Sequence, residues 1–583
     1  MFRNVYTKLT EQQIAQKLAP VKAPANTCVC DACAPDALSG TNLKICTDKA
    51  LELSYEFLSK QELLISQNGA LPVKAAYTAL TLGSVILFSH LLPDSQTAFH
   101  VVLDRKTGLA TIFETWFSDE FIKDKREAQR AVYFGYAETK GSPAPEKRHA
   151  VTNRLENKGI VWTNDLGVKT FTVFNSTCYS TFIELSDPKM GIPIAAPSDY
   201  IKINDELYIF SRVEAEFSGT FILEVIDLFT VSQIGVRLGF NLDDEPEYTM
   251  YCGTGEIVGQ LATFAGFTDY GGSFDMNSLN SMVLPDEKMP KGKRPVYRVH
   301  GQYPDITDEE ARNAGKNPRS FPKVDESIMP SGHSMPDSDY LIGKELTVAN
   351  DDGPKWQYRF IDICTLLWKD AEETEWHEET YKAFEPDKDL IMFAHVQTGS
   401  EYGKGVTAVL DFSNGLTTCF LSRIGNGYSN REVGFKVYFG VLEIKDGAQP
   451  PAYLRHQFTT ELVGRAFTWN YSGGENAVTS MHVYHSPWGY SWTIYLPNGE
   501  GGLLWTSPCV YIKLRKDIYM MSWVEETSAG GQGTVLMNLK TMHDCGIFYG
   551  LGEGNQAGLS SIGAFARNAG SFDILKYYEL KTK

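Results

Sequence analysis

YIKINDELYIFSRVEAEFSGTFILEVIDLFTVSQIGVRLG, residues 200–239, aligns without a gap to YIKLRKDIYMMSWVEETSAGGQGTVLMNLKTMHDCGIFYG, residues 511–550. Identical residues recur along the whole alignment, among them Tyr200, Tyr208, Ser211, Glu214, Gly219, Gly235 and Gly239. Both stretches consist of short apolar or alternating runs separated by turn sequences such as RKD and SAGGQG. This pattern is typical of antiparallel strands linked by hairpins, so the sequence predicts a β-structure that occurs twice.

Other stretches agree in the same order, for example VVLDRKTGLAT with AVLDFSNGLTT. We therefore interpret the chain as a tandem duplication, with a first half from about residue 37 to 275 and a second half from about 337 to 583. Residues 1–36 form an N-terminal extension. Residues 276–336, rich in Pro, Gly and charge, are predicted to be a linker, within which TDEEARNAG predicts one short helix.

Each half is itself double, because motifs of its first part recur in its second part. The four predicted units span about 37–120, 148–275, 337–425 and 460–583. Units of this size with about eight strands suit small closed antiparallel barrels, which leave no exposed strand edge. The predicted fold class is all-β, with two barrels per half. Helix-length periodicity is confined to the first 20 residues and to the region near residues 371–384.

Composition excludes several classes of function. The net charge of -18 and the lack of a basic stripe argue against nucleic-acid binding. No apolar run approaches the length of a membrane span, and the N-terminal residues lack the apolar core of a signal peptide, so we expect a cytoplasmic protein without a membrane segment.

The ten cysteines are scattered over the chain, mostly in apolar runs, which favours buried reduced thiols over a disulfide framework. Cys28, Cys30 and Cys33 lie close together, with Cys46 further along. Zinc binding by these thiolates is the alternative, but the second CxxC pair of a zinc site is missing, so no metal site is predicted. No nucleotide motif or nucleophile elbow stands out, and no cofactor is predicted.

The second half resembles the molybdenum cofactor biosynthesis protein F (MoaF) family. The motifs that carry the resemblance are DDGPKWQYRFID, LDFSNGLTTC, SPWGYSWTIY, SPCVYIKLRKDIYMMSWVEE and GTVLMNLKTMHDCGIFYG, and together they span most of residues 338–575. The first half looks like a diverged duplicate. The family name reflects genetic context, and nothing in the sequence is built to hold a pterin or molybdenum.

A local similarity is more informative about function. Residues 517–550 resemble the central strands of phenolic acid decarboxylases, which are single calycin (lipocalin-like) barrels. In those enzymes a Glu that ends a Ser-Trp-x-Glu run is the catalytic acid, and Glu525 occupies that place. The resemblance implies two tyrosines near the start of the barrel, but this chain has Trp469 and Tyr471 there. The substrate-binding Arg has no clear counterpart, which puts decarboxylation itself in doubt.

Alternate side chains of a strand share a face, so Tyr519, Met521, Trp523 and Glu525 point together. If this face lines the barrel lumen, Glu525 is a carboxyl group surrounded by aromatic rings, and desolvation would raise its pKa toward that of a general acid. On spacing alone, a solvated position on the outer face is the alternative, since Glu is rarely buried. The decarboxylase resemblance favours the lumen.

Further candidates surround this glutamate. Tyr471 and His543 are candidate catalytic residues together with Glu525, although a structural role of a lone strand histidine is the alternative for His543. The aromatic candidates are equally compatible with simple core packing. The candidate substrate-binding residues are Trp469, Tyr490, Tyr511, Arg515, Tyr519 and Trp523, and the equivalents in the first half are Glu214 and Tyr208.

Two classes of function remain open, with a scaffold for a biosynthetic partner as a third possibility. The first is a cofactor-independent lyase, isomerase or cyclase that uses acid and base groups in a barrel lumen, in secondary or aromatic metabolism. The second is a non-catalytic carrier whose lumen binds a hydrophobic or aromatic small molecule. In the first half, Arg515, Trp523 and His543 are replaced by Asn204, Arg212 and Ser232, so we expect that half to be a packing partner or a diverged second site.

Overall fold

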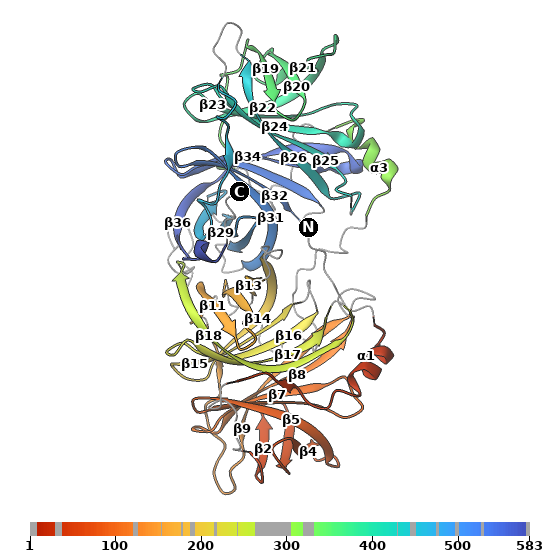
Figure 1. Ribbon diagram of the computed structural model, residues 1–583, viewed down its shortest axis with the longest axis vertical. Coiled ribbons are helices and arrows are strands. Elements are labelled where there is room, and N and C mark those ends of the chain that lie inside the picture. Colours follow the sequence, from red (N-terminus) through yellow and green to blue (C-terminus); the bar gives the residue numbers. More distant parts are fainter. Residues whose placement is uncertain are drawn as a thin grey trace.

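The computed structural model describes most of the chain. The described residues are 9–29, 38–119, 126–152, 154–175, 179–186, 193–214, 219–241, 243–262, 305–318, 332–427, 429–443, 450–473, 477–495, 501–525 and 530–578. Within them the strands close into four eight-stranded antiparallel barrels, numbered here in chain order (Figure 1). The all-β prediction with two barrels per half is therefore confirmed.

Barrels 1 and 2 form the first half. Barrel 1 consists of β2 (Asn42–Thr47), β3 (Glu52–Phe57), β4 (Glu62–Gln67), β5 (Val73–Leu82), β6 (Val85–Leu91), β7 (Ala98–Asp104), β8 (Leu109–Ser118) and β9 (Glu127–Ala137). Barrel 2 consists of β11 (Lys158–Asn164), β12 (Lys169–Val173), β13 (Tyr179–Glu184), β14 (Ile194–Lys202), β15 (Leu207–Glu214), β16 (Thr220–Asp227), β17 (Ser232–Phe240) and β18 (Pro246–Gln260). Two short strands join barrel 2 from outside, β1 (Ala25–Asn26) on β18 and β10 (Ala150–Val151) on β14.

Barrels 3 and 4 form the second half. Barrel 3 consists of β19 (Glu345–Asn350), β20 (Lys355–Phe360), β21 (Thr365–Asp370), β22 (His377–Asp387), β23 (Leu390–Val396), β24 (Gly405–Asp411), β25 (Leu416–Ile424) and β26 (Val433–Glu443). Barrel 4 consists of β28 (Arg465–Asn470), β29 (Thr479–Ser486), β30 (Gly489–Tyr495), β31 (Gly501–Arg515), β32 (Ile518–Glu525), β33 (Gly531–Asn538), β34 (His543–Leu551) and β36 (Phe565–Ser571). Two further strands, β27 (Gln457–Phe458) and β35 (Ala557–Ile562), pair with β31 and β34.

The duplication predicted from the sequence recurs strand by strand. The bounds of β15, β16 and β17 coincide with those of β32, β33 and β34 under the gapless alignment. The single long strand β18 corresponds to β35 and β36 together. The predicted unit boundaries near residues 120 and 425 leave out the closing strands β9 and β26, which lie beyond them.

The four barrels stack in a row in the order 1, 2, 4, 3 (Figure 1). A buried apolar cluster joins each neighbouring pair: one between barrels 1 and 2, one between barrels 3 and 4, and one between barrels 2 and 4. Backbone bonds reinforce the central junction, where Ala262 N–H donates to Ala569 O (2.7 Å) and Asp573 N–H donates to Val258 O (2.8 Å). The two halves therefore meet through their second barrels.

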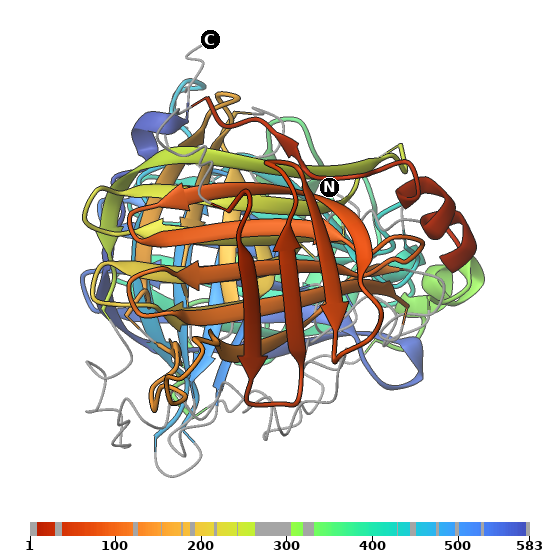
Figure 2. The ribbon, with the colours of Figure 1, turned by 90° about the horizontal axis from the view of Figure 1, so that it is seen from below.

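Helices are short in the described part of the chain. Helix α1 (Glu11–Leu18) lies at the side of the first half and buries Ile14 and Leu18 against the cluster between barrels 1 and 2 (Figure 2). Helix α3 (Asp308–Arg312) begins at a Thr307 capping box, as the linker sequence predicts. The helical periodicity near residues 371–384 was misleading, because residues 377–387 form β22, whose burial largely alternates.

Candidate functional site

The inner face of barrel 4 carries the residues singled out from the sequence. Tyr519, Met521 and Trp523 of β32 belong to the buried cluster inside this barrel, whereas Ile518 and Met520 pack against barrel 3. Glu525 shares the face of Trp523 because strand residues alternate. Glu525 is 8% exposed, so this carboxyl group lies inside the barrel and not in bulk solvent.

Aromatic rings form most of this lumen. Tyr490 contacts the Trp523 ring edge-on at 5.8 Å and the His482 ring at 5.2 Å, and Tyr484 contacts Tyr511 edge-on at 5.5 Å. All of these rings are buried. Further large side chains of the same cluster are Phe467, Trp469, Trp492 and Trp505. The lumen therefore has a low local polarity, in which each polar group interacts strongly with its neighbours.

Glu525 accepts a hydrogen bond from the Trp523 indole, Nε1 to Oε2, at 3.3 Å. An N–H donated to a carboxylate oxygen stabilises negative charge there. Trp523 occupies space that is open because Gly533 lies opposite, where a Cβ atom would meet the indole ring at 2.1 Å. Gly533 therefore allows the indole to lie flat against β33 beside the carboxyl group.

A second carboxyl group, Asp544, was missed by the sequence analysis. It pairs with Met537, which in turn pairs with Tyr519, so all three side chains share the inner face. Asp544 is 3% exposed, and burial raises its pKa to about 8, although Ala564 N–H donates to its Oδ1 at 2.5 Å. A buried carboxyl group with this pKa is largely protonated at neutral pH and can act as an acid.

Tyr471 is influenced by the charges of both of these acids. Burial raises its pKa well above the usual value, and the charges of Asp544 and Glu525 act in the same direction. Its hydroxyl lies 3.5 Å from His482 Nε2. Burial lowers the pKa of His482 to about 3, so this imidazole is neutral. The structure thus brings Glu525, Asp544, Tyr471 and His482 to one lumen.

His543 faces the other way. It lies on the outer face of β34, next to Cys545 and Ile547 in register, and its Nε2 lies 2.9 Å from His333 O. Its ring stacks on Phe565 at 4.2 Å. Asp544, and not the adjacent His543, faces the lumen, since a shift of one position on a strand moves a side chain to the opposite face.

Arg515 also lies outside the lumen. Its guanidinium binds Asp411 of barrel 3 through two hydrogen bonds (2.9 and 2.7 Å) and Asp387 through a third (2.8 Å). Asp411 is fully buried. The predicted substrate-binding arginine therefore joins barrels 3 and 4, and the structure does not bring it to the other candidates.

The remaining tyrosines line the inner wall with their hydroxyls directed to protein groups. Tyr511 donates to Gly489 O (3.2 Å), and Tyr519 donates to Glu461 Oε2 (2.7 Å). Trp469 and Tyr490 are fully buried in the lumen. These contacts place Tyr511 and Tyr519 as wall elements whose hydroxyls already have partners.

The equivalent glutamate of barrel 2 has a different environment. Glu214 is held by two arginines, Arg212 (3.2 Å) and Arg237 (3.1 Å). Arg212 stands where barrel 4 has Trp523. Tyr208 donates its hydroxyl to Asp205 O (3.1 Å). The two halves therefore share a buried glutamate, but barrel 2 surrounds it with arginines whereas barrel 4 places an indole ring beside it.

Barrels 1 and 3 are filled by packed apolar cores. His90 and His395 occupy equivalent positions, and each lies close to a buried tyrosine hydroxyl, Tyr55 (3.2 Å) and Tyr358 (3.3 Å) respectively. Burial lowers the pKa of His90 to about 4 and that of His395 to about 3. Both histidines are neutral core residues.

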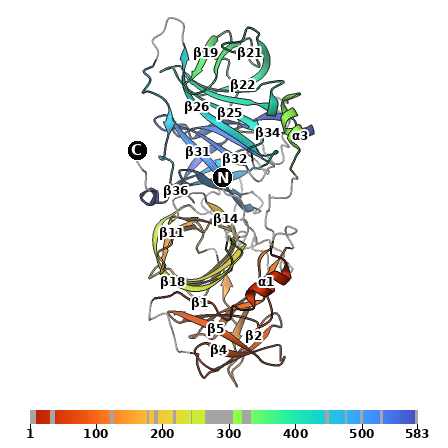
Figure 3. The same ribbon diagram turned by 45° about the vertical axis from the view of Figure 1, so that its right-hand side comes forward.

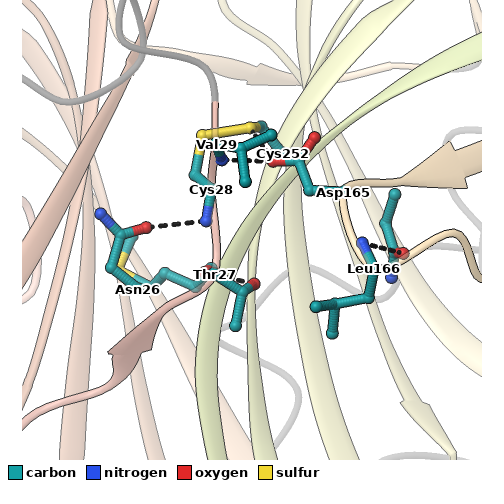
Figure 4. The surroundings of a disulfide bond; sticks show 9 residues. Asn26, Thr27, Cys28, Val29, Asp165, Leu166 and Cys252 are labelled. Carbon is teal, nitrogen blue, oxygen red and sulfur yellow. Dashed lines mark hydrogen bonds between the residues drawn. A yellow bond between two sulfur atoms is a disulfide. The ribbon is translucent and has the colours of Figure 1, made fainter.

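The expectation of reduced cysteines is wrong for one pair. Cys28 and Cys252 form a disulfide that ties the N-terminal extension to β18, beside Asp165, whose carboxylate accepts Val29 N–H at 2.9 Å (Figure 4). Sequence alone did not pair them because they lie 224 residues apart. Cys46, at the start of barrel 1, is free. Cys30 and Cys33 lie outside the described residues.

Comparison with family models gives the relationship of the second half. The MoaF N-terminal domain model matches residues 321–426, which include most of barrel 3, and the MoaF C-terminal domain model matches residues 456–571, which include barrel 4. The second half belongs to the MoaF family. In this chain a MoaF-type pair of barrels is thus preceded by a second pair, in which β15, β16 and β17 have the same bounds as β32, β33 and β34.

Other comparisons add little. No curated protein matches the chain. Among solved structures, the LG1-3 region of the laminin alpha2 chain aligns over 71% of this chain and 88% of that chain with 9% identity and a TM-score of 0.09, which is too low to support an argument. No helix in the described part of the protein is long and apolar enough to span a bilayer.

Proposed function

We propose that barrel 4 is the active site of a lyase, isomerase or cyclase that acts by acid and base groups on an aromatic or conjugated small molecule. The observation that carries this proposal is that two buried carboxyl groups of one aromatic lumen, Glu525 and Asp544, both act on the Tyr471 hydroxyl. Carboxyl groups with different environments can take the acid and base roles of one site.

The roles follow from the environments of the two groups. Asp544, with a pKa of about 8, holds a proton at neutral pH and serves as the acid. Glu525 accepts the Trp523 N–H and is proposed as the base, in place of the acid role that the decarboxylase resemblance implies. Tyr471 positions the substrate through its hydroxyl, and the rings of Tyr490 and Trp523 hold an apolar substrate by contact. The proposed reaction moves a proton and uses only these side chains.

A carrier that binds the same class of molecule without converting it is the competing function. Comparing the metabolites of cells with and without the protein identifies the compound, because this experiment needs no prior choice of substrate. Binding and conversion are then measured separately with the purified full chain.

Glu525→Gln and Asp544→Asn are the decisive variants. Each is expected to lower turnover by about 100-fold or more while binding changes little, since only proton transfer is removed. Glu379→Gln is the matched control: Glu379 is a buried carboxyl group of barrel 3 whose pKa is raised by burial, and it lies outside barrel 4. Full turnover in both lumen variants would rule out the acid and base roles of these two residues, and binding without conversion by the native protein would leave the carrier.

A further inference from the structure

The inner face of barrel 2, whose strands form a ring in Figure 3, carries charged side chains at three positions where barrel 4 has apolar ones. Arg212 replaces Trp523, Arg237 replaces Phe548 and Glu224 replaces Val535 under the gapless alignment. Pairing confirms the inner positions, since Glu224 lies opposite Phe210, a member of the buried cluster inside barrel 2. Barrels 2 and 4 are therefore suited to different ligands.

The ionic groups of barrel 2 balance one another. Arg212 donates to Glu214 at 3.3 and 3.2 Å, and its guanidinium lies 4.5 Å from the centre of the Phe182 ring. Arg237 bridges Glu214 (3.1 Å) and Glu247 (2.9 Å). Two cations thus face these two anions and Glu224, a third carboxyl group whose pKa is raised by burial. A charged ligand would bring an uncompensated charge into this chamber, which is costly in a buried site.

Five buried side chains on the inner face of this barrel have polar atoms without a hydrogen-bond partner: Thr172 Oγ1, Thr220 Oγ1, Glu224 Oε2, Gln233 Oε1 and Trp162 Nε1. The last three are the large side chains, and each of them is 3% exposed. All three point inward: Gln233 pairs with Ile226 of the inner cluster, and Trp162 belongs to that cluster itself. Buried polar atoms are almost always satisfied, so these mark where a ligand or ordered water binds.

The set contains both donors and acceptors. Trp162 donates only, whereas the Gln233 oxygen accepts. Glu224 accepts the Tyr251 hydroxyl at 2.7 Å through Oε1, and burial raises the pKa of this carboxyl group. Its second oxygen, Oε2, can accept a hydrogen bond from a ligand when Glu224 is ionised and can donate one when Glu224 is protonated. Hydroxyl groups fit this mixture, because each one can donate and accept. Rings of Phe210, Tyr200 and Trp162 complete the wall with apolar faces.

We infer that barrel 2 is a second binding site, for an uncharged, hydroxyl-rich small molecule held by Glu224, Gln233 and Trp162. This site is separate from the proposed active site of barrel 4. Its ligand is recognised by hydrogen bonds, while the barrel 4 substrate is held by aromatic contact and by the Tyr471 hydroxyl.

Trp162 provides a specific reporter, because it is the one tryptophan between residues 148 and 275. The full chain, labelled with 5-fluorotryptophan, is titrated with D-glucose and myo-inositol as neutral polyols, and its fluorine NMR spectrum is recorded. Trp162→Phe assigns the Trp162 signal. The barrel 4 tryptophans report in the same spectrum, so failure of the two sites can be told apart.

At least one of the two polyols is expected to shift the Trp162 signal saturably. Glu224→Val, which introduces the residue of barrel 4, is expected to weaken this binding by about 10-fold or more, while Glu224→Gln retains it. D-glucuronate, the charged match of glucose, and indole, an apolar probe, should bind more weakly. The inference is overturned if neither polyol moves the signal, which would leave water as the occupant, or if glucuronate or indole binds more tightly.

Discussion

At the scale of single residues, Asp544 is the most informative position. Its pKa is raised from 3.8 to about 8 by burial, so the folded protein prefers the protonated acid. The stability that Asp544 contributes is therefore complete below its unfolded pKa and is lost as the pH rises toward 8.

Asp544→Asn cannot ionise and keeps an oxygen for Ala564 N–H. We expect this variant to gain stability relative to the native protein between about pH 5 and pH 8, by roughly 2 to 4 kcal/mol. Urea unfolding at the two pH values measures the gain. Equal differences at both pH values would show that the side chain is already ionised in the folded state.

The sequence could identify the strand that carries Glu525 and the residues that share its face, and the decarboxylase resemblance favoured the lumen for this face. It could not choose between His543 and Asp544. Both residues are polar and adjacent, and only pairing with Met537 fixes which one lies inside.

At the scale of elements, Arg515 joins two barrels at the end of β31. Arg515→Met would leave Asp411 buried without its cation, which is expected to destabilise the protein by about 3 to 5 kcal/mol. Arg312→Met, at an exposed ion pair of α3, is the control and should change stability by less than about 0.5 kcal/mol.

Chemical unfolding measures both variants. The double variant Arg515→Met with Asp411→Asn should recover part of the loss, since the uncompensated charge is then removed as well. A small effect of Arg515→Met alone would mean that the turn around Asp411, where Ser413 and Asn414 also donate to its carboxylate, satisfies this group by itself.

Some elements can be predicted from local sequence patterns, whereas others are determined by contacts with distant parts of the chain. The hairpin turns and the barrel number follow from local runs, but β22 does not: its residues also fit a helical period, and pairing with β21 and β23 makes them a strand. Arg515 was expected in the lumen for a similar reason, since the contact that holds it comes from a barrel more than 100 residues earlier in the chain.

At the scale of the whole molecule, the two halves meet through barrels 2 and 4, and Phe572 is central to this junction. Its ring lies edge-on to Phe171 at 5.5 Å and fills the space above Gly159, where a Cβ atom would come within 2.5 Å of the ring. Phe572→Ala is expected to destabilise the protein by about 3 to 5 kcal/mol.

The same variant should also uncouple the halves. Calorimetry is then expected to record two unfolding transitions for the variant and a single transition for the native protein. Phe229→Ala removes an exposed ring of equal size and is the control, with a change within about 0.5 kcal/mol. An unchanged single transition in Phe572→Ala would show that the backbone bonds at Ala262 and Asp573 suffice to couple the halves.

The Cys28–Cys252 bond changes the covalent topology of the first half. Because it links a residue before barrel 1 to the last strand of barrel 2, both barrels lie within one closed ring of chain. A protease cut in any loop of this ring opens it but releases no fragment. Nicked protein should therefore migrate as one species on a non-reducing gel and separate into pieces only after a thiol is added.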